Sequence, residues 1–216
     1  MKHPTSRDQQ KDQTRKLILD TANALFKKHK YEDVSIKDIC SASGVSVGTF
    51  YHHFESKDYL VELFYDEFDY YIEQFQDTFN SLHPLEALFY LTEQETNYLS
   101  SSVTYPSQIC IMQLLAGGEA FKRESRAYYR CINNIISRIA EKNLSESMTE
   151  VQLRSTILRS IRGNLYDWCL HSGGYDLKER ALQDLCLLIV GLHAVGKMHL
   201  TPEDNKFLVE KFSGEK

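Results

Sequence analysis

One short stretch of the sequence, Val47-Gly48-Thr49-Phe50-Tyr51-His52-His53, combines hydroxyl, phenol and imidazole groups and contains no carboxylate. These groups exchange hydrogen bonds with phosphate oxygens and base edges, and no acidic side chain would repel a phosphate. Gly48 lowers helix stability, so its place in so short a segment indicates that another molecule approaches the backbone closely. Lys57 follows at the start of the next predicted helix, where its ammonium and the free backbone amides would together bind an anion. The stretch therefore predicts contact with the backbone and bases of a nucleic acid.

The outward side chains of this stretch would read base edges. Phe50 and Phe54 are four residues apart, so both can anchor one side of a helix in a core. Because Val47 has no hydrogen-bonding group, base readout would depend on Thr49, on His52 and on contact between Val47 and a thymine methyl. The alternative is an ordinary amphipathic helix end whose rings are solvated.

A helix-turn-helix is the arrangement that would present this stretch. An amphipathic helix over about residues 12–30 precedes it, and Ser35 and Asp38 form a capping box that starts a second, short helix. Gly44 can adopt the positive φ that ends this helix, and Ser46 then caps the third helix over residues 47–53. Two short helices joined by a glycine-containing turn form the unit whose second helix enters the major groove of DNA.

The rest of the chain also has helical periodicity, and no alternating stretch is long enough to predict a sheet. The predicted fold class is therefore all-α, with about nine to ten helices. A long fourth helix is expected from residue 58 through Phe79, and prolines, glycines and a second capping box at Thr149 predict the later ones. These cover about residues 84–101, 106–116, 119–142, 149–170 and 177–197, and a short helix begins at residue 201.

Four segments of the N-terminal part resemble the signature of the tetracycline-repressor (TetR) family. They are Val34-Ser35-Ile36-Lys37-Asp38-Ile39, Gly44-Val45-Ser46, Thr49-Phe50-Tyr51-His52-His53-Phe54 and Ser56-Lys57-Asp58-Tyr59-Leu60, and the likeness covers about residues 12–64. The resemblance implies a homodimeric, ligand-responsive transcriptional repressor that binds a palindromic operator. Residues 1–57 would form its DNA-binding head, and residues 58–216 its effector-binding and dimerisation body.

The resemblance also assigns roles within the head. Tyr51 matches a tyrosine that binds a backbone phosphate, Lys57 a lysine that does the same, and Lys37 a position that reaches a base or a phosphate in some members. The predicted contact surface is completed by the residues at and around the variable, sequence-reading positions: Ser46, Val47, Gly48, Thr49 and His52.

Charge is divided between these two parts of the chain. Residues 1–57 hold 10 Lys and Arg against 7 Asp and Glu, whereas residues 58–216 hold 15 against 23. A head of net charge +3 on a body of net charge −8 is expected if only the head meets a polyanion.

The body is rich in aromatic side chains, of which eleven of the chain's 25 lie between Phe64 and Tyr105. This density predicts a ring-lined effector pocket, although most of these rings are individually as well explained as core. The pocket candidates have a polar group and share one bundle: Tyr71, Tyr90, Gln94, Tyr98, Gln113, Tyr128, Arg162, Asn164 and Trp168. Ring faces favour a hydrophobic, cationic effector, whereas Arg162 favours an acid or, alternatively, makes a structural ion pair.

The two long C-terminal helices predict a homodimer. Apolar residues surround nearly the whole of the helix over residues 177–197, more than one side of a monomer can bury. Gly191 and Gly196 would let a second helix approach closely, which favours a four-helix bundle about a two-fold axis. The predicted interface is Leu182, Leu185, Leu188, Ile189 and Leu192; the alternative is the central core helix of a monomer.

Other classes of protein fit less well. His171 and Asp167 could pair, but no Ser or Cys is placed to be activated and no phosphate-binding loop is present, so catalysis is not expected. His52 and His53 point about 100° apart with no third ligand, and no metal or other cofactor is expected. The alternative function is a helical small-molecule-binding or redox-sensing protein that does not bind DNA.

The location of the protein is also indicated by the sequence. The five cysteines are odd in number and widely spaced, which is typical of buried fillers rather than disulfides. No apolar stretch approaches the roughly 20 residues that a bilayer requires, and no apolar segment follows the N-terminal charges. We therefore expect a cytoplasmic protein with no membrane partner.

Overall fold

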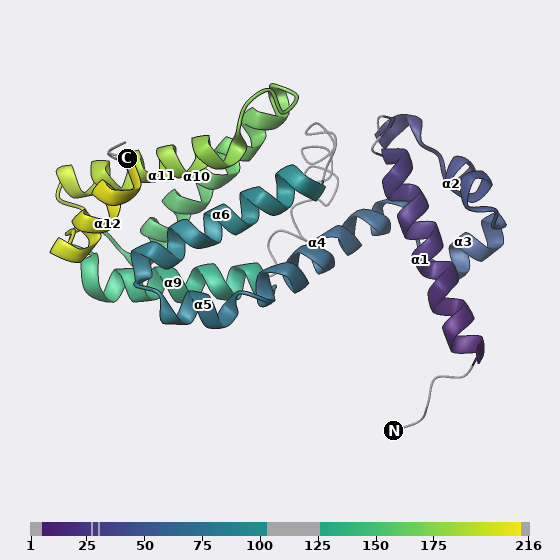
Figure 1. Ribbon diagram of the computed structural model, residues 1–216, viewed down its shortest axis with the longest axis horizontal. Coiled ribbons are helices and arrows are strands. Elements are labelled where there is room, and N and C mark those ends of the chain that lie inside the picture. The colour runs from purple at the N-terminus through teal and green to yellow at the C-terminus, as the bar shows by residue number, and fades with distance from the viewer. Residues whose placement is uncertain (1–5, 27, 30, 103–125, 213–216) are drawn as a thin grey trace. The chain divides into compact units, whose positions relative to one another are not determined.

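Figure 1 shows the protein as a computed structural model, which describes residues 6–26, 28–29, 31–102 and 126–212. All regular elements within these ranges are helices, and the one isolated bridge pairs Leu144 with Met198. The described residues form two compact units, of which the first ends at Asp66 and the second begins at Glu67. The predicted all-α class is confirmed.

The head is built from α1 (Ser6–Phe26), the single 3-10 turn η1 (Tyr31–Asp33), α2 (Ile36–Ser43) and α3 (Val47–His53). α1 begins and ends earlier than predicted. At its end, the rings of Phe26 and Tyr31 pack with centroids 5.2 Å apart. The resulting core takes side chains from every element: Ile18, Ala22, Tyr31, Val34, Ile39, Cys40, Phe50 and Phe54.

The local signals that start and stop α2 and α3 are confirmed. Ser35 and Asp38 form the reciprocal capping box, and the hydrogen bonds from Ser35 lower the pKa of the Asp38 carboxyl. Gly44 adopts φ +70°, the left-handed conformation that ends α2. The Ser46 hydroxyl accepts a hydrogen bond from the amide of Thr49 at 3.0 Å and so caps α3.

Within the described residues, the body contains six further helices and shares α4 (Lys57–Glu73) with the first unit. These helices are α5 (Gln76–Ser81), α6 (Pro84–Ser102), α9 (Ala127–Asn143), α10 (Glu150–Leu170), α11 (Leu177–Ala194) and α12 (Pro202–Phe212). α6 packs against α9 and α11, and α10 packs against the same two helices (Figure 1). The Thr149 capping box and the helix-opening prolines at residues 84 and 202 are confirmed. The helix predicted over residues 106–116, and the start of the next one, lie outside the described residues.

The long helix predicted from residue 58 through Phe79 is wrong, because the chain breaks into α4 and α5 around Gln74 and Phe75. There the amides of Gln74 and Phe75 bond to carbonyls three residues back, which tightens and ends α4. The guanidinium of Arg138 in α9 then donates to the carbonyls of Phe79 at 2.8 Å and Leu82 at 2.5 Å. The carbonyls at the end of α5 are thus bound by a side chain that lies 59 and 56 residues away in the sequence.

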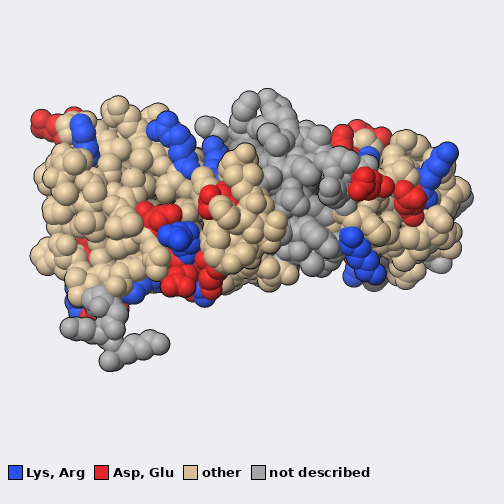
Figure 2. All heavy atoms as spheres, turned by 90° about the horizontal axis from the view of Figure 1, so that it is seen from above, with Lys and Arg blue, Asp and Glu red and all other residues tan. Residues whose placement is uncertain are grey.

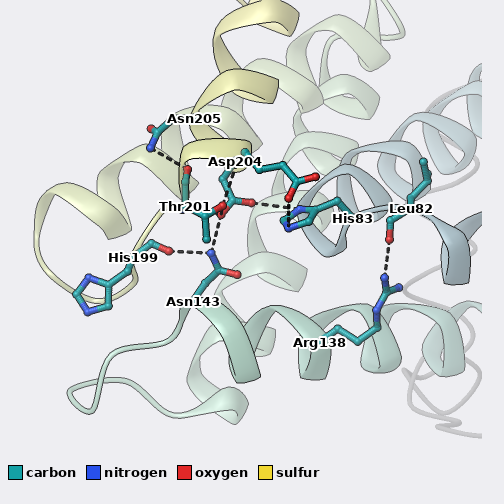
Figure 3. A network of polar contacts seen from close by, with 9 residues as sticks. Leu82, His83, Arg138, Asn143, His199, Thr201, Asp204 and Asn205 are labelled. Carbon is teal, nitrogen blue, oxygen red and sulfur yellow. Dashed lines mark hydrogen bonds and ion pairs between the residues drawn. The ribbon is translucent and has the colours of Figure 1, made fainter.

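A buried polar network fastens α12 to the rest of the body (Figure 3). Asp204 is 0% exposed and accepts hydrogen bonds from the amide of Thr201 at 2.8 Å, its hydroxyl at 2.7 Å and Nδ2 of Asn143 at 2.8 Å. The other carboxylate oxygen lies 3.3 Å from Nδ1 of His83, which precedes α6. This one carboxylate therefore links α6, α9 and α12.

Candidate functional site

α3 exposes the side chains that were predicted to contact DNA. Phe50 and Phe54 are fully buried, which turns Val47, Gly48, Tyr51 and His52 outward. Tyr51 is 55% exposed, and its ring meets the Phe50 ring edge-on at 5.6 Å. This geometry leaves the phenol hydroxyl at the surface, where it can donate to a phosphate oxygen.

Two of the predicted base-reading residues are bonded to each other. The hydroxyls of Ser46 and Thr49 lie 2.8 Å apart, and Thr49 is half-buried. This hydrogen bond uses part of the capacity of the Thr49 hydroxyl, so contact with a base would use its remaining lone pairs or its proton. Lys37 is exposed in the first turn of α2, as a phosphate contact requires.

Lys57 has contacts within the head that the sequence did not predict. Its ammonium donates to the carbonyls of Tyr31 at 2.8 Å and Val34 at 2.9 Å, and it lies 3.9 Å from the centre of the Tyr31 ring. Tyr31 in turn donates its hydroxyl to the carboxylate of Asp58. Lys57 thus ties α4 to η1, and any phosphate would share its ammonium with two carbonyls.

The structure places two basic side chains of α1, Lys11 and Arg15, near His52 and His53 at the end of α3. The guanidinium of Arg15 lies 5.4 Å from the centre of the Phe54 ring, and the rings of His52 and His53 are 5.2 Å apart. Burial, and then the charges of His52, Lys11 and Arg15, lower the pKa of His53. The sequence offers Lys11 and Arg15 as possible phosphate or minor-groove contacts, with a solvated tail as the alternative, and their i, i+4 spacing puts both on one face of α1.

In the body, five predicted pocket residues gather with neighbouring phenylalanines in one aromatic cluster. The hydroxyl of Tyr71 donates to Gln94 at 2.9 Å, and the ring centres of Tyr71 and Tyr98 are 4.9 Å apart. Further ring contacts bring in the others: Phe68 to Tyr98 and Tyr128 at 5.2 and 5.6 Å, and Tyr90 to Phe75 and Phe79 at 5.9 and 5.8 Å.

The remaining pocket candidates lie apart from this cluster. Arg162 is exposed and donates to the hydroxyl of Tyr129 at 2.6 Å, which favours the structural alternative for this residue. Trp168 is buried and its indole donates to the carbonyl of Tyr175 at 3.0 Å. Asn164 bonds to Ser160 one turn earlier, and Gln113 lies outside the described residues.

Glu95 is a candidate site residue that was not predicted from the sequence. It is only 9% exposed, and its carboxylate accepts a hydrogen bond from the hydroxyl of Tyr128 at 2.8 Å. Burial raises the pKa of Glu95 to about 7 and raises that of Tyr128 well above its ordinary value. The available signal was its spacing of four residues from both Leu91 and Leu99 on the buried stripe of α6.

The predicted dimer interface needs correction. Leu182, Leu185 and Ile189 are buried in the core of the body, and Leu188 and Leu192 are half-buried against it. The large apolar residues that α11 exposes are instead Leu187 and Val190, and those that α10 exposes are Val151, Tyr166 and Leu170. Helical periodicity alone could not separate these two faces, because apolar residues surround α11.

An open groove of about 890 Å³ runs between α10 and α11 on this exposed side. Leu187, Leu188, Gly163 and Asn164 line it together with charged residues of both helices. A side-chain atom built on Gly163 or Gly191 would meet nothing within 4 Å, so another helix could approach the backbone there. Figure 2 looks onto the upper side of the body in Figure 1, where uncharged residues cover most of the visible surface.

Other chemistries find little support in the part of the chain that the structure describes. No three His, Cys, Asp or Glu side chains there could hold a metal ion, and no helix there is long and apolar enough to cross a bilayer. Cys40, Cys131 and Cys169 are buried and Cys186 is half-buried, while Cys110 lies outside the described residues. Burial raises the pKa of the Cys40, Cys131 and Cys186 thiols, which lowers their reactivity.

Comparison with known proteins places the head in a sequence family. Residues 18–63 match the family described as bacterial regulatory proteins, tetR family. Over a longer span, the chain is similar to the HTH-type transcriptional regulator AcrR of Shigella flexneri. The two are 23% identical over 193 residues, which is 84% of this chain and 90% of AcrR.

Solved structures extend the likeness to the body. The transcriptional regulator FadR from Bacillus subtilis, in complex with stearoyl-CoA, matches with a TM-score of 0.67 and 19% identity over 82% of this chain and 99% of FadR. NalD of Pseudomonas aeruginosa, the secondary repressor of the MexAB-OprM multidrug efflux pump, matches with a TM-score of 0.63 and 22% identity. That match covers 85% of this chain and 97% of NalD. At these identities the likeness shows the fold alone.

Proposed function

Because the chain belongs to the TetR family of transcriptional regulators, we propose that it represses genes from a palindromic operator and releases the DNA when a small hydrophobic effector binds. The protein is a DNA-binding regulator rather than an enzyme. It would act in the cytoplasm, with residues 1–57 on DNA and residues 58–216 holding the effector and a second subunit.

The outward face of α3 is the observation that best supports the proposed DNA-binding surface. It presents Tyr51, His52, Val47 and the bare backbone of Gly48, with no carboxylate among them. Lys11 and Arg15 beside it add positive charge that would bind phosphates without regard to base sequence. In a symmetric dimer, two such faces about 34–36 Å apart would enter successive major grooves of a palindrome.

The effector-binding role is supported by the aromatic cluster and Glu95 in the body. A regulator must pass the energy of effector binding to its DNA-binding face, so the effector and the operator weaken each other by the same factor. FadR was solved in complex with stearoyl-CoA, so a regulator of similar fold binds a small molecule. Titration of the operator complex with candidate effectors tests this part of the proposal.

The Tyr51 contact gives a direct test of the docking. Tyr51→Phe removes only the hydroxyl, and a hydrogen bond to a charged group contributes about 1.5–3 kcal/mol. We expect operator affinity to fall about tenfold or more, by similar factors on operator and on unrelated duplexes, because a phosphate contact carries no base information.

Fluorescence anisotropy with DNA from the region beside the protein's own gene measures both affinities. Tyr70→Phe is the matched control, since Tyr70 is 69% exposed in the body. Unchanged affinity of the Tyr51 variant would contradict the proposed docking. Failure of the wild-type protein to bind any fragment would favour the alternative of a helical small-molecule-binding or redox-sensing protein.

A further inference from the structure

We propose that the effector is an organic cation and that Glu95 provides its counter-charge within the aromatic cluster. This inference rests on the proposed effector response and names the chemical class of the ligand. It begins from the carboxylate of Glu95, which is buried on α6 among uncharged side chains.

Glu95 has little to stabilise a negative charge. A carboxylate offers about four acceptor sites, yet within the described residues Glu95 receives one hydrogen bond, from Tyr128. No Lys or Arg of those residues pairs with it. The basic side chain that acts on it through its charge, Arg162, is exposed and bonds to Tyr129 instead.

A buried charge without a partner is costly, and the protein reduces that cost by taking up a proton. Burial raises the pKa of Glu95 to about 7, so the carboxyl is partly protonated near neutral pH. A cation placed beside it would supply the missing partner and favour the ionised form. An anionic head group would instead face a second negative charge.

The rings around Glu95 suit the same ligand. Phe68 lies between Tyr98 and Tyr128 with ring centres 5.2 and 5.6 Å apart, and Tyr129 meets Tyr128 edge-on at 5.6 Å. Aromatic faces attract ammonium-type and other diffuse organic cations, most strongly where water is excluded. A neutral acyl chain would also contact these rings, but it would leave the carboxyl without a partner.

Two probes of the same shape and opposite charge test the inference: tetraphenylphosphonium and tetraphenylborate. The full-length wild-type protein should bind the cation far more tightly than the anion in isothermal titration calorimetry. Glu95→Gln keeps the size of the side chain and removes its charge, so affinity for the cation should fall at least tenfold. Glu93→Gln is the control on the same helix, because Glu93 pairs with Lys178 and Lys211 at the surface, and its affinity should match wild type.

The pH dependence gives a second readout that a merely structural role would not produce. Since the cation binds the ionised carboxylate, its affinity should rise about tenfold from pH 6 to pH 8, as ionisation of a group with a pKa of about 7 becomes nearly complete. The Glu95→Gln variant should show no such rise, and thermal unfolding will confirm that it is folded.

Equal binding of the two probes, or an unchanged affinity in Glu95→Gln, would overturn the inference. If a neutral or acyl compound releases the operator while tetraphenylphosphonium does not, the proposed function holds and the inference that the effector is a cation is wrong. If no compound of any charge releases the operator, the effector response itself fails.

Discussion

Leu187→Arg is expected to convert the proposed homodimer to a monomer and to weaken operator binding a hundredfold or more. Leu187 is 70% exposed on α11, lines the groove against α10 and lies near Gly191, where the backbone is open. An arginine in place of this leucine would put a longer, charged side chain into the face that a second subunit would cover, which would be strongly destabilising. Loss of the second head removes the gain from two linked binding sites, which is commonly 10²–10⁴-fold.

Light scattering after gel filtration measures the mass, and anisotropy measures the DNA affinity. Val209→Arg is the matched control, because Val209 is 59% exposed on α12 and does not line the groove. It should remain dimeric and bind DNA like wild type. A Leu187 variant that keeps the mass of the wild-type dimer would refute this interface, and a monomeric wild type would refute the palindromic operator as well.

Asp204→Ala is expected to lower the free energy of unfolding of the body by roughly 3 kcal/mol or more. The carboxylate accepts hydrogen bonds from the amide and hydroxyl of Thr201 and from Asn143, all at 2.7–2.8 Å. Its removal leaves these buried donors without an acceptor and opens a small cavity. α12 should therefore detach more readily from α6 and α9.

Urea unfolding followed by fluorescence gives this free energy, because the single tryptophan, Trp168, lies in the body. Glu203→Ala is the control from the adjacent position. Its carboxylate is 71% exposed and lies 3.7 Å from His83, and surface pairs of this kind contribute less than about 1 kcal/mol. Equal effects of the two variants would show that the buried network contributes little.

The features of the head that could be predicted from sequence are local ones. The Ser35 and Asp38 box, the positive φ of Gly44 and the Ser46 cap each depend on a few neighbouring residues. The break between α4 and α5 could not be predicted, because no Pro or Gly marks it. The contacts of Arg138 with the carbonyls at the end of α5 could not be predicted either, because they require the folded body.

The same distinction separates the site residues that were found from those that were missed. Phe50 and Tyr51 follow from helical spacing, which assigns one to the core and the other to the surface. The carbonyls that hold Lys57 belong to residues more than 20 positions earlier, and the burial of Glu95 depends on packing between helices. Apolar residues surround α11, so the sequence does not show which face of this helix packs into the core. Leu185 was therefore predicted to contact a second subunit, whereas it is buried in the core of the body.

Separate hydrophobic cores in the head and in the body have a consequence for how the protein responds to heat. The head buries its own cluster around Phe50, while the body buries a larger one around the isoleucines of α9. A unit of about 60 residues buries a smaller share of its surface than a larger one, so the head should melt first and calorimetry should resolve two transitions. Between the two melting temperatures, the head would be unfolded and would release the operator, while the effector-binding body would remain folded. Expression of the repressed genes would then rise with temperature in the absence of any effector.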